Sequence, residues 1–294
     1  MMRIECFLDY LRLERNYSQL TVLKYESCLR LFEDFFRNLN AELEWESVDA
    51  DVIRDWMEDM MDQGLTAATV NGRLSAVRSF YRFALKRGMV ESDPAHTVTG
   101  PKKEKPLPKF IREKDMERLL DPDMWDDSYK DVCARTIILL FYETGVRVSE
   151  LVAINDDMVD LDSRQLKVTG KRNKQRIIPF GPELEQTLRD FVKQRDEQVE
   201  REESGFFLTE KGQRITDSQV RRMVKTQLGR VTTQQKRTPH VLRHTFATTM
   251  LNHEAGLESV KKLLGHESLA TTEIYTHTTF EQLKKVYEKA HPRS

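Results

Sequence analysis

The last third of the chain reads His240-Val241-Leu242-Arg243-His244, then Leu263-Leu264-Gly265-His266, then Tyr275-Thr276-His277. No zinc, nucleotide or acyl-transfer signature accompanies this run of an Arg, several His and a late Tyr. A phenol has a pKa of about 10, so it becomes a useful nucleophile only beside positive charge or a base. An Arg fork matches two oxygens of a phosphate, and a His can exchange a proton near neutral pH. The order favours a tyrosine nucleophile with phosphate-binding support, and a nucleic-acid backbone as its substrate.

Two basic residues far upstream extend this set. Arg147 lies among mostly apolar residues, where a guanidinium needs a partner, either Glu150 or a bound anion. Lys171 is predicted at the tip of a hairpin, from which its ammonium could protonate a leaving oxygen. Judged alone, each residue also fits a structural role, as an ion pair or an exposed turn lysine. His240 and His244 have a zinc-ligand spacing as well, but no third ligand is evident, so we expect no metal site.

Composition indicates a soluble globular protein with a charged surface. The chain has 294 residues, of which 39% are hydrophobic and 32% charged. Because no apolar stretch reaches spanning length and the first residues lack the apolar core of a signal peptide, we expect a cytoplasmic protein without membrane insertion. Cys6, Cys28 and Cys133 have no paired spacing, which favours reduced thiols.

The distribution of charge is more informative than the sum. Lys and Arg number 47 and Asp and Glu 48, which gives a net charge of −1. However, residues 163–176 hold only basic charges, and residues 214–243 hold eight basic residues and one acid. Such stripes can meet a phosphate backbone, although a solvated face is the alternative for any one of them. The expected DNA-contacting residues are Arg73, Arg78, Arg82, Lys102, Lys103, Arg172, Lys174, Arg221 and Arg222.

Periodicity predicts two domains joined by a linker. Residues 1–90 have apolar positions at helical spacing and fit about four helices, with Ser18 and Thr66 as N-caps. Residues 91–109 are rich in Pro and Lys, which predicts an extended linker. Residues 110–294 are predicted to hold a buried helix at 131–142 ended by Gly145, a hairpin, and further helices. The hairpin strands are 165–169 and 175–179, and the helices are about 182–202, 216–229, 239–252, 256–264 and 279–290.

Taken in order, these motifs resemble the tyrosine recombinase (phage integrase) family, and within it the Xer group of bacterial site-specific recombinases. The order is Arg147, Lys171, His240-Val-Leu-Arg243, Leu264-Gly-His266 and Tyr275. The resemblance runs nearly end to end, and includes Leu11-Arg-Leu-Glu-Arg15, Thr144-Gly-Val-Arg-Val-Ser-Glu-Leu151 and His291-Pro-Arg293. It implies a mainly α fold with a small β-sheet or hairpin. An N-terminal helical, SAM-like core-binding domain would precede a tyrosine-recombinase catalytic domain.

The resemblance also implies a mechanism. The implied catalytic residues are Arg147, Lys171, His240, Arg243, His266 and Tyr275. Tyr275 would attack the scissile phosphodiester to form a 3′-phosphotyrosyl link and a free 5′-hydroxyl. The two Arg would stabilise the phosphate, Lys171 would protonate the leaving oxygen, His240 would handle the Tyr proton, and His266 would donate a hydrogen bond. Because the covalent link conserves the bond energy, neither ATP, a metal nor another cofactor is expected.

The partners that the resemblance implies are double-stranded DNA with a specific recombination site and further recombinase subunits. Family members act as a DNA-bound tetramer, here a homotetramer or a heterotetramer with a paralogous recombinase. They exchange strands through a Holliday junction and pass a C-terminal helix, here about 280–290, to a neighbour. Resolution of chromosome dimers is the expected role, with a septal DNA translocase as a further partner.

Three other interpretations share parts of this pattern. A type IB topoisomerase-like enzyme would make the same cleavage and relax DNA, but the helical N-terminal domain argues against it. A non-catalytic DNA-binding protein is disfavoured by the complete set of Arg, Lys, His and Tyr. An integrase of a mobile element would use the same chemistry, and it remains the alternative, with the lack of an arm-binding domain before residue 1 favouring the simple Xer type.

Overall fold

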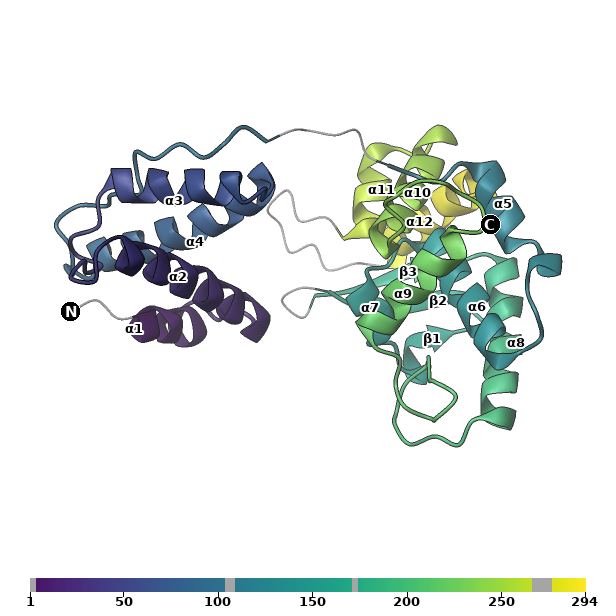
Figure 1. Ribbon diagram of the computed structural model, residues 1–294. Helices are drawn as coiled ribbons and strands as arrows, with labels where there is room; N and C mark the ends of the chain where they lie inside the picture. Colours follow the sequence, from purple (N-terminus) through teal and green to yellow (C-terminus); the bar gives the residue numbers. More distant parts are fainter. Residues whose placement is uncertain (1–3, 104–108, 171–173, 266–276) are drawn as a thin grey trace. The chain divides into compact units, whose positions relative to one another are not determined.

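The computed structural model describes residues 4–103, 109–170, 174–265 and 277–294, and it separates the chain into two compact units (Figure 1). Unit 1 spans Met1–Pro106 and unit 2 spans Leu107–Ser294. None of the helices in the described ranges is long and apolar enough to cross a membrane. The fold is mainly helical, with one small antiparallel sheet in unit 2.

Unit 1 is a helical bundle. Its elements are α1 (Ile4–Asp9), the π-helical turn η1 (Tyr10–Glu14), α2 (Gln19–Leu39), α3 (Ala50–Asp62) and α4 (Ala67–Lys86). The side chains of Ser18 and Thr66 accept hydrogen bonds from the backbone at the starts of α2 and α4, as predicted for N-caps. Aromatic rings fill the core, and the ring centroids of Trp45 and Phe80 lie 4.5 Å apart. The helical character predicted for residues 1–90 and the two helix starts at Ser18 and Thr66 are therefore confirmed.

The first part of the predicted linker belongs to this bundle. Ala95 and Val98 are buried in the core of unit 1. Arg78 on α4 donates hydrogen bonds to the carbonyl oxygens of both residues, and Asn71 Nδ2 donates to the carbonyl oxygen of Pro101 at 2.8 Å. The chain up to Pro101 is thus packed along α4, because two small apolar side chains and several backbone carbonyls find partners there. Residues 104–108 lie outside the described ranges.

Unit 2 is built around one central helix. Its helices are α5 (Glu113–Leu120), α6 (Tyr129–Thr144), α7 (Val148–Val152), α8 (Pro182–Gln198), α9 (Asp217–Leu228), α10 (Pro239–Asn252), α11 (Leu257–Leu264) and α12 (His277–Ala290), with 3-10 turns η2 (Pro122–Met124) and η3 (Asp156–Met158). Helix α6 is buried along most of its length and packs against α8 and α10. It ends at Gly145, which has the left-handed φ of +59° that the sequence predicts for a helix-stopping Gly.

The sheet carries the predicted hairpin. Its strands are β1 (Val159–Asp160), β2 (Gln165–Thr169) and β3 (Gln175–Pro179), in the order β1-β2-β3. Strands β2 and β3 pair antiparallel, from Gln165 opposite Pro179 to Thr169 opposite Gln175. The two-residue β1, and also α5 and α7, were not predicted, since such short elements carry too little periodicity.

The end of α8 corrects a prediction. The sequence predicted a helix to residue 202, whereas α8 ends at Gln198. Val199 takes an extended backbone conformation and buries its side chain in the core of unit 2. Burial of one apolar side chain here outweighs the helix propensity of the charged residues that follow.

Replacement of Gly145 with Ala should destabilise unit 2 by about 2–4 kcal/mol. An added Cβ would lie 2.5 Å from Phe246 Cδ1 and 2.8 Å from Leu264 Cδ2, and the left-handed φ adds strain. Gly88 is the control, because it also has a positive φ (+65°) but has open space around its added Cβ. Calorimetric or denaturant unfolding would measure both variants. Equal losses for the two would contradict tight packing at Gly145.

Candidate active site

Two of the predicted catalytic arginines meet at the C-terminal end of α11. Arg147 Nη2 donates to the carbonyl oxygen of Gly265 at 3.2 Å. Arg243 on α10 donates from Nη1 to the carbonyl oxygen of Gly145 and from Nη2 to that of Leu264, both at 2.6 Å. The last carbonyls of a helix have no partner within the helix and carry partial negative charge, so cations stabilise them. The end of α11 therefore fixes both guanidiniums.

Glu150, one of the two partners that the sequence left open for Arg147, is the acid that pairs with it. The backbone N–H of Arg147 donates to Glu150 Oε2 at 2.8 Å, and Arg147 Nη1 donates to Oε1 at 2.7 Å. Glu150 stands three residues into α7, where a carboxylate can accept from the residue before the helix. A five-residue helix thus sets the position of Arg147.

A third arginine, Arg176 on β3, completes the cluster. Its Nη1 and Nη2 donate to the two oxygens of Glu150 at 2.7 and 2.8 Å, and its Nε donates to the carbonyl oxygen of Leu263 at 2.9 Å. In the sequence Arg176 stands out only as one member of the basic stripe at residues 163–176. The sequence signal that could have identified Arg176 is the period-two alternation of its strand, which turns residues 176 and 178 inward. A buried Arg at such a position requires an acidic partner.

The cluster has more positive than negative charge. Three guanidiniums surround one carboxylate, which leaves a surplus of two positive charges. Burial raises the pKa of Glu150, but hydrogen bonds from Arg176 and Arg147 outweigh it and lower the pKa to about 2. Burial, followed by the charges of Arg147 and Arg176, lowers the pKa of Arg243 to about 10. Glu150 and Arg243 are therefore both ionised at neutral pH, and the surplus of guanidiniums in the site favours a bound anion.

Both phosphate-binding candidates keep donors for such an anion. A guanidinium has five N–H donors, and the side-chain contacts described for Arg147 and Arg243 use two in each. Arg147 is part-exposed, with 35% of its side chain accessible, whereas Arg243 is buried. The arrangement can bind a phosphate through two planar forks held by carbonyl oxygens.

His240 stands at the start of α10, on the turn before Arg243. Partial burial lowers the pKa of His240, and the charges of Arg221 and Arg243 lower it further. A His with a lowered pKa is neutral at pH 7, so one ring nitrogen can accept a proton. His240 is thus suited to act as a base close to the arginine cluster.

The remaining predicted catalytic residues lie outside the described ranges. Lys171 falls between Gly170 and Lys174, whose backbones are joined by a hydrogen bond of 2.7 Å from the Gly170 N–H. His266 directly follows Gly265, the turn residue whose carbonyl oxygen Arg147 binds. In the sequence, Tyr275 lies two positions before His277, the first residue of α12. Their roles stay predictions.

Helix α12, which follows Tyr275, is anchored to α6 by a buried carboxyl group. Glu143 Oε2 accepts hydrogen bonds from the Tyr287 hydroxyl at 3.0 Å and from the Gly181 N–H at 2.8 Å. Burial raises the pKa of Glu143 to about 8, although both hydrogen bonds oppose the shift. The His291 ring stacks on Tyr287 at a centroid distance of 5.2 Å. The end of the chain therefore packs beside the helix that leads to Arg147.

The candidate DNA contacts of unit 1 differ in availability. Arg78 is part-buried, and its guanidinium binds the carbonyl oxygens of Ala95 and Val98, which gives it a structural function inside unit 1. Arg82 is exposed on α4, and Arg73 is part-buried on the same helix. Arg82 is the member of this predicted row that a phosphate reaches most directly.

Among the described residues, the other predicted contacts lie on loops and on α9. Lys102, Lys103 and Lys174 are exposed, and Arg172 lies outside the described ranges. Arg221 is exposed and paired with Asp217 one helical turn before it. An exposed ion pair of this kind contributes little to the free energy of folding, so a phosphate can replace the carboxylate as the partner of Arg221.

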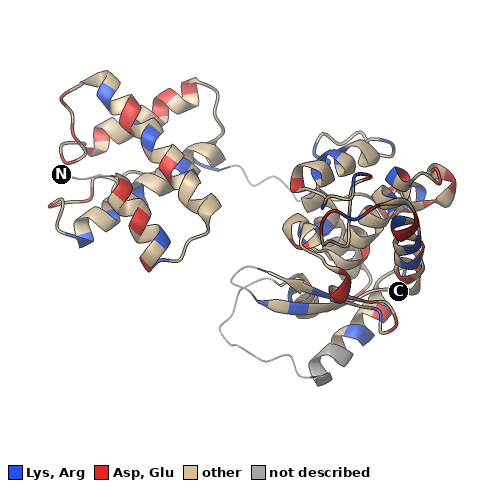
Figure 2. Cartoon of the chain, turned by 90° about the horizontal axis from the view of Figure 1, so that it is seen from below, with Lys and Arg blue, Asp and Glu red and all other residues tan. Residues whose placement is uncertain are grey.

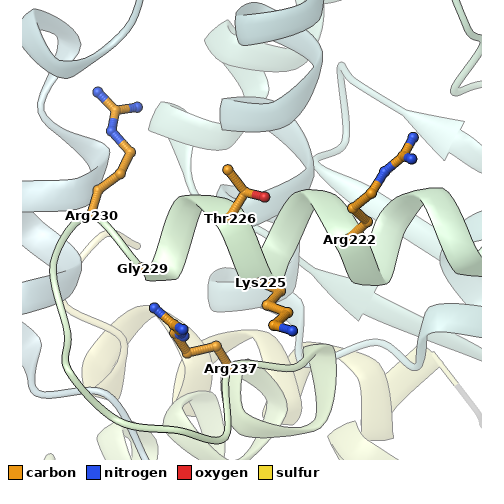
Figure 3. A pocket seen from close by; sticks show the side chains of 6 residues that line it. All are labelled: Arg222, Lys225, Thr226, Gly229, Arg230 and Arg237. Atoms are coloured by element: carbon orange, nitrogen blue, oxygen red, sulfur yellow. The ribbon is translucent and has the colours of Figure 1, made fainter.

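Arg222 belongs to a basic pocket at the end of α9. The pocket has a volume of about 560 Å³ and is lined by Arg222, Lys225, Thr226, Gly229, Arg230 and Arg237. Figure 3 shows Arg237 reaching from a neighbouring segment toward Gly229. The Nε of Arg237 is buried and has no hydrogen-bond partner among the described residues. Acidic and basic residues alternate along the elements of both units (Figure 2), so a lining whose charged members are all basic is a local feature.

Comparison with known proteins places this geometry in a family. The phage integrase family model matches residues 109–282, and the model of the phage integrase N-terminal SAM-like domain matches residues 4–88. The tyrosine recombinase XerC of Chlorobaculum tepidum is 37% identical over 98% of this chain and 94% of its own length. The XerC of Thermodesulfovibrio yellowstonii is 35% identical over 98% and 95%.

A solved structure shares the fold. The XerH site-specific recombinase, crystallised with a palindromic difH substrate, superposes with a TM-score of 0.72 at 22% identity, over 92% of this chain and 80% of XerH. The two family models together cover most of the sequence, in the order expected from the motifs. The chain therefore belongs to the phage integrase family, and within that family it is a Xer-type site-specific tyrosine recombinase, an enzyme that breaks and rejoins DNA.

Proposed function

We propose that this recombinase cuts double-stranded DNA at a specific site through a 3′-phosphotyrosyl link and rejoins it through a Holliday junction. The observation that carries the proposal is the surplus of positive charge on Arg147, Arg176 and Arg243 around one carboxylate. Fixed donors of this kind stabilise the charge that develops on a phosphate during substitution. The XerH site-specific recombinase, which was crystallised as a post-cleavage complex with its difH substrate, supports the same class of substrate.

Each of the six predicted catalytic residues has a proposed role in the cleavage reaction. The Tyr275 oxygen bonds to phosphorus while the bond from phosphorus to the 5′ oxygen breaks. Neutral His240 accepts the phenol proton, and the Lys171 ammonium gives a proton to the leaving 5′ oxygen. Arg147 and Arg243 bind the non-bridging oxygens, with a hydrogen bond from His266. A 5′-hydroxyl from the second strand then reverses the steps.

The link conserves the energy of the broken bond, so the proposal includes neither ATP, a metal ion nor another cofactor. The charge that a metal would supply in other phosphoryl-transfer sites comes here from the arginines. The proposed assembly is a tetramer on DNA, composed of this chain alone or of this chain and a paralogous recombinase. The proposed role is resolution of chromosome dimers in the cytoplasm, with a septal DNA translocase as regulator; the similarity to XerC recombinases supports the Xer type of enzyme. The alternative is integration of a mobile element.

Capture of covalent adducts tests the proposal. The full chain would be incubated with fragmented genomic DNA from its source organism in the presence of EDTA, denatured, and separated from unlinked DNA. Sequencing of the attached ends should give one recurrent site with the protein on the 3′ phosphate. Adducts that form only without EDTA would refute the metal-free mechanism, and 5′ attachment would refute the proposed chemistry.

The basic pocket should supply phosphate contacts without base specificity. The double variant Arg222→Ala with Lys225→Ala is expected to bind the mapped site and random duplexes more weakly by the same factor. The slope of log affinity against log salt should fall by about 2, because each lost phosphate contact removes about 0.9. Lys130 and Lys193, exposed on α6 and α8, provide the control double variant. Loss of affinity for the mapped site alone would instead indicate base contacts.

A further inference from the structure

We propose that Arg176 is a positioning residue for DNA cleavage, which holds Glu150 and the end of α11 so that Arg147 keeps its charge for the phosphate. This inference rests on the proposed function and extends it to a residue that does not itself reach the substrate. Arg176 is 7% exposed, and each of its three nitrogens donates a hydrogen bond to Glu150 or to the carbonyl oxygen of Leu263.

The first step concerns the geometry of the shared carboxylate. Glu150 accepts two hydrogen bonds from Arg147 and two from Arg176, and its side chain is 2% exposed. A carboxylate has about four acceptor positions, so the two arginines occupy all of them. The fork of Arg176 approaches from β3 and fixes the plane of the carboxylate. That plane in turn fixes the direction of the Arg147 guanidinium.

The second step concerns charge. With Arg176 present, the carboxylate is shared between two cations, and Arg147 is only partly neutralised. Without it, Glu150 would be a buried anion with Arg147 as its one direct cation, and the attraction between them would strengthen in this poorly hydrated site. The surplus around the phosphate position would fall from two positive charges to one. Arg147 would then be drawn toward Glu150 rather than toward DNA.

The third step concerns the turn that ends α11. The three arginines take three successive carbonyl oxygens, with Arg176 on Leu263, Arg243 on Leu264 and Arg147 on Gly265. A Cβ added to Gly265 would lie 3.2 Å from both Cδ and Nη1 of Arg176, so the turn is packed directly on this side chain. Arg176 therefore supports the acceptors that orient both phosphate-binding arginines.

The test is single-turnover cleavage of a duplex that carries the mapped site. Arg176→Gln should lower the cleavage rate by about 10²-fold, because small displacements of catalytic groups have effects of this size. DNA affinity should change less than twofold, since many other phosphate contacts remain. Arg195→Gln is the matched control. Arg195 is also buried in unit 2, with a two-bond pair to Asp156, but it has no contact with the cluster.

A substrate with an uncharged scissile linkage distinguishes an effect of Arg176 on the phosphate-binding arginines from a general loss of protein stability. When a methylphosphonate replaces the scissile phosphate, the transition state carries one negative charge less and depends less on the arginines. The rate ratio of the native chain to Arg176→Gln should shrink at least tenfold on this substrate, whereas the ratio for Arg195→Gln should stay unchanged. Equal ratios on both substrates would overturn the proposal.

Arg176→Lys retains the positive charge but lacks the planar guanidinium fork. It provides a second test of the proposal if Arg176→Gln folds poorly. We expect a rate between those of the native chain and Arg176→Gln, with partial recovery on the methylphosphonate. A Lys variant as fast as the native chain would show that charge alone matters and would refute the fixed-plane argument. If the native chain itself forms no adduct, the proposed function fails instead.

Discussion

Replacement of Tyr275 with Phe is expected to abolish the covalent DNA adduct and to leave DNA affinity within about twofold of the native value. The reason is that unit 2 has four tyrosines, and the other three are buried hydroxyls. Burial raises the pKa of Tyr129 and Tyr142, and Tyr287 is in addition hydrogen-bonded to Glu143. Such phenols remain protonated and are enclosed by protein, so they cannot attack a phosphodiester.

The measurement is denaturing electrophoresis of protein with a nicked duplex that carries the mapped site. The nick lets the short cleaved fragment leave, so adducts accumulate. Tyr142→Phe is the control, because it removes a buried hydroxyl from the same unit and should keep the adduct. Persistence of the adduct in Tyr275→Phe would show that the nucleophile is another residue. Loss of DNA binding in that variant would show that the substitution has disturbed more than chemistry.

Sequence patterns predicted the features that depend on local spacing. The pair of Arg147 and Glu150 lies within one turn, in apolar surroundings that leave a guanidinium few other partners. The hairpin and the caps at Ser18 and Thr66 follow from period-two alternation and from local hydrogen bonding. Each of these features involves residues close together in the chain, so their spacing alone determines the contact.

The features that were missed depend on contacts between distant segments. Arg176 and Glu150 are 26 residues apart, and no spacing rule joins a strand residue to an acid on a short helix. Arg78 binds carbonyl oxygens 17 and 20 residues later, a contact that the sequence did not predict, and its predicted DNA contact stays a prediction. A basic residue on a helix face looks the same in sequence whether or not it also binds a backbone carbonyl. Only the packed structure shows the carbonyl contacts.

Replacement of Arg243 with Lys is expected to lower the cleavage rate by about 10²–10³-fold, with DNA affinity nearly unchanged. Arg243 is buried at 7% exposure and uses two donors to hold the carbonyl oxygens of Gly145 and Leu264. A Lys has a single ammonium, which cannot bind both carbonyls and present a planar fork to a phosphate at the same time. The charge would remain, but its geometry would be lost.

Arg195→Lys is the matched control for this prediction. Arg195 is also buried in unit 2, and its Nη1 donates to the carbonyl oxygen of Phe206 and to Asp156, away from α7 and from the arginine cluster. Its loss should lower thermal stability without changing the cleavage rate at a temperature where both variants are folded. If Arg243→Lys cleaves at the rate of Arg195→Lys, the fork of Arg243 has no part in stabilising the transition state. The cleavage rates of the two variants are compared in single turnovers at saturating protein, because such rates do not depend on DNA affinity.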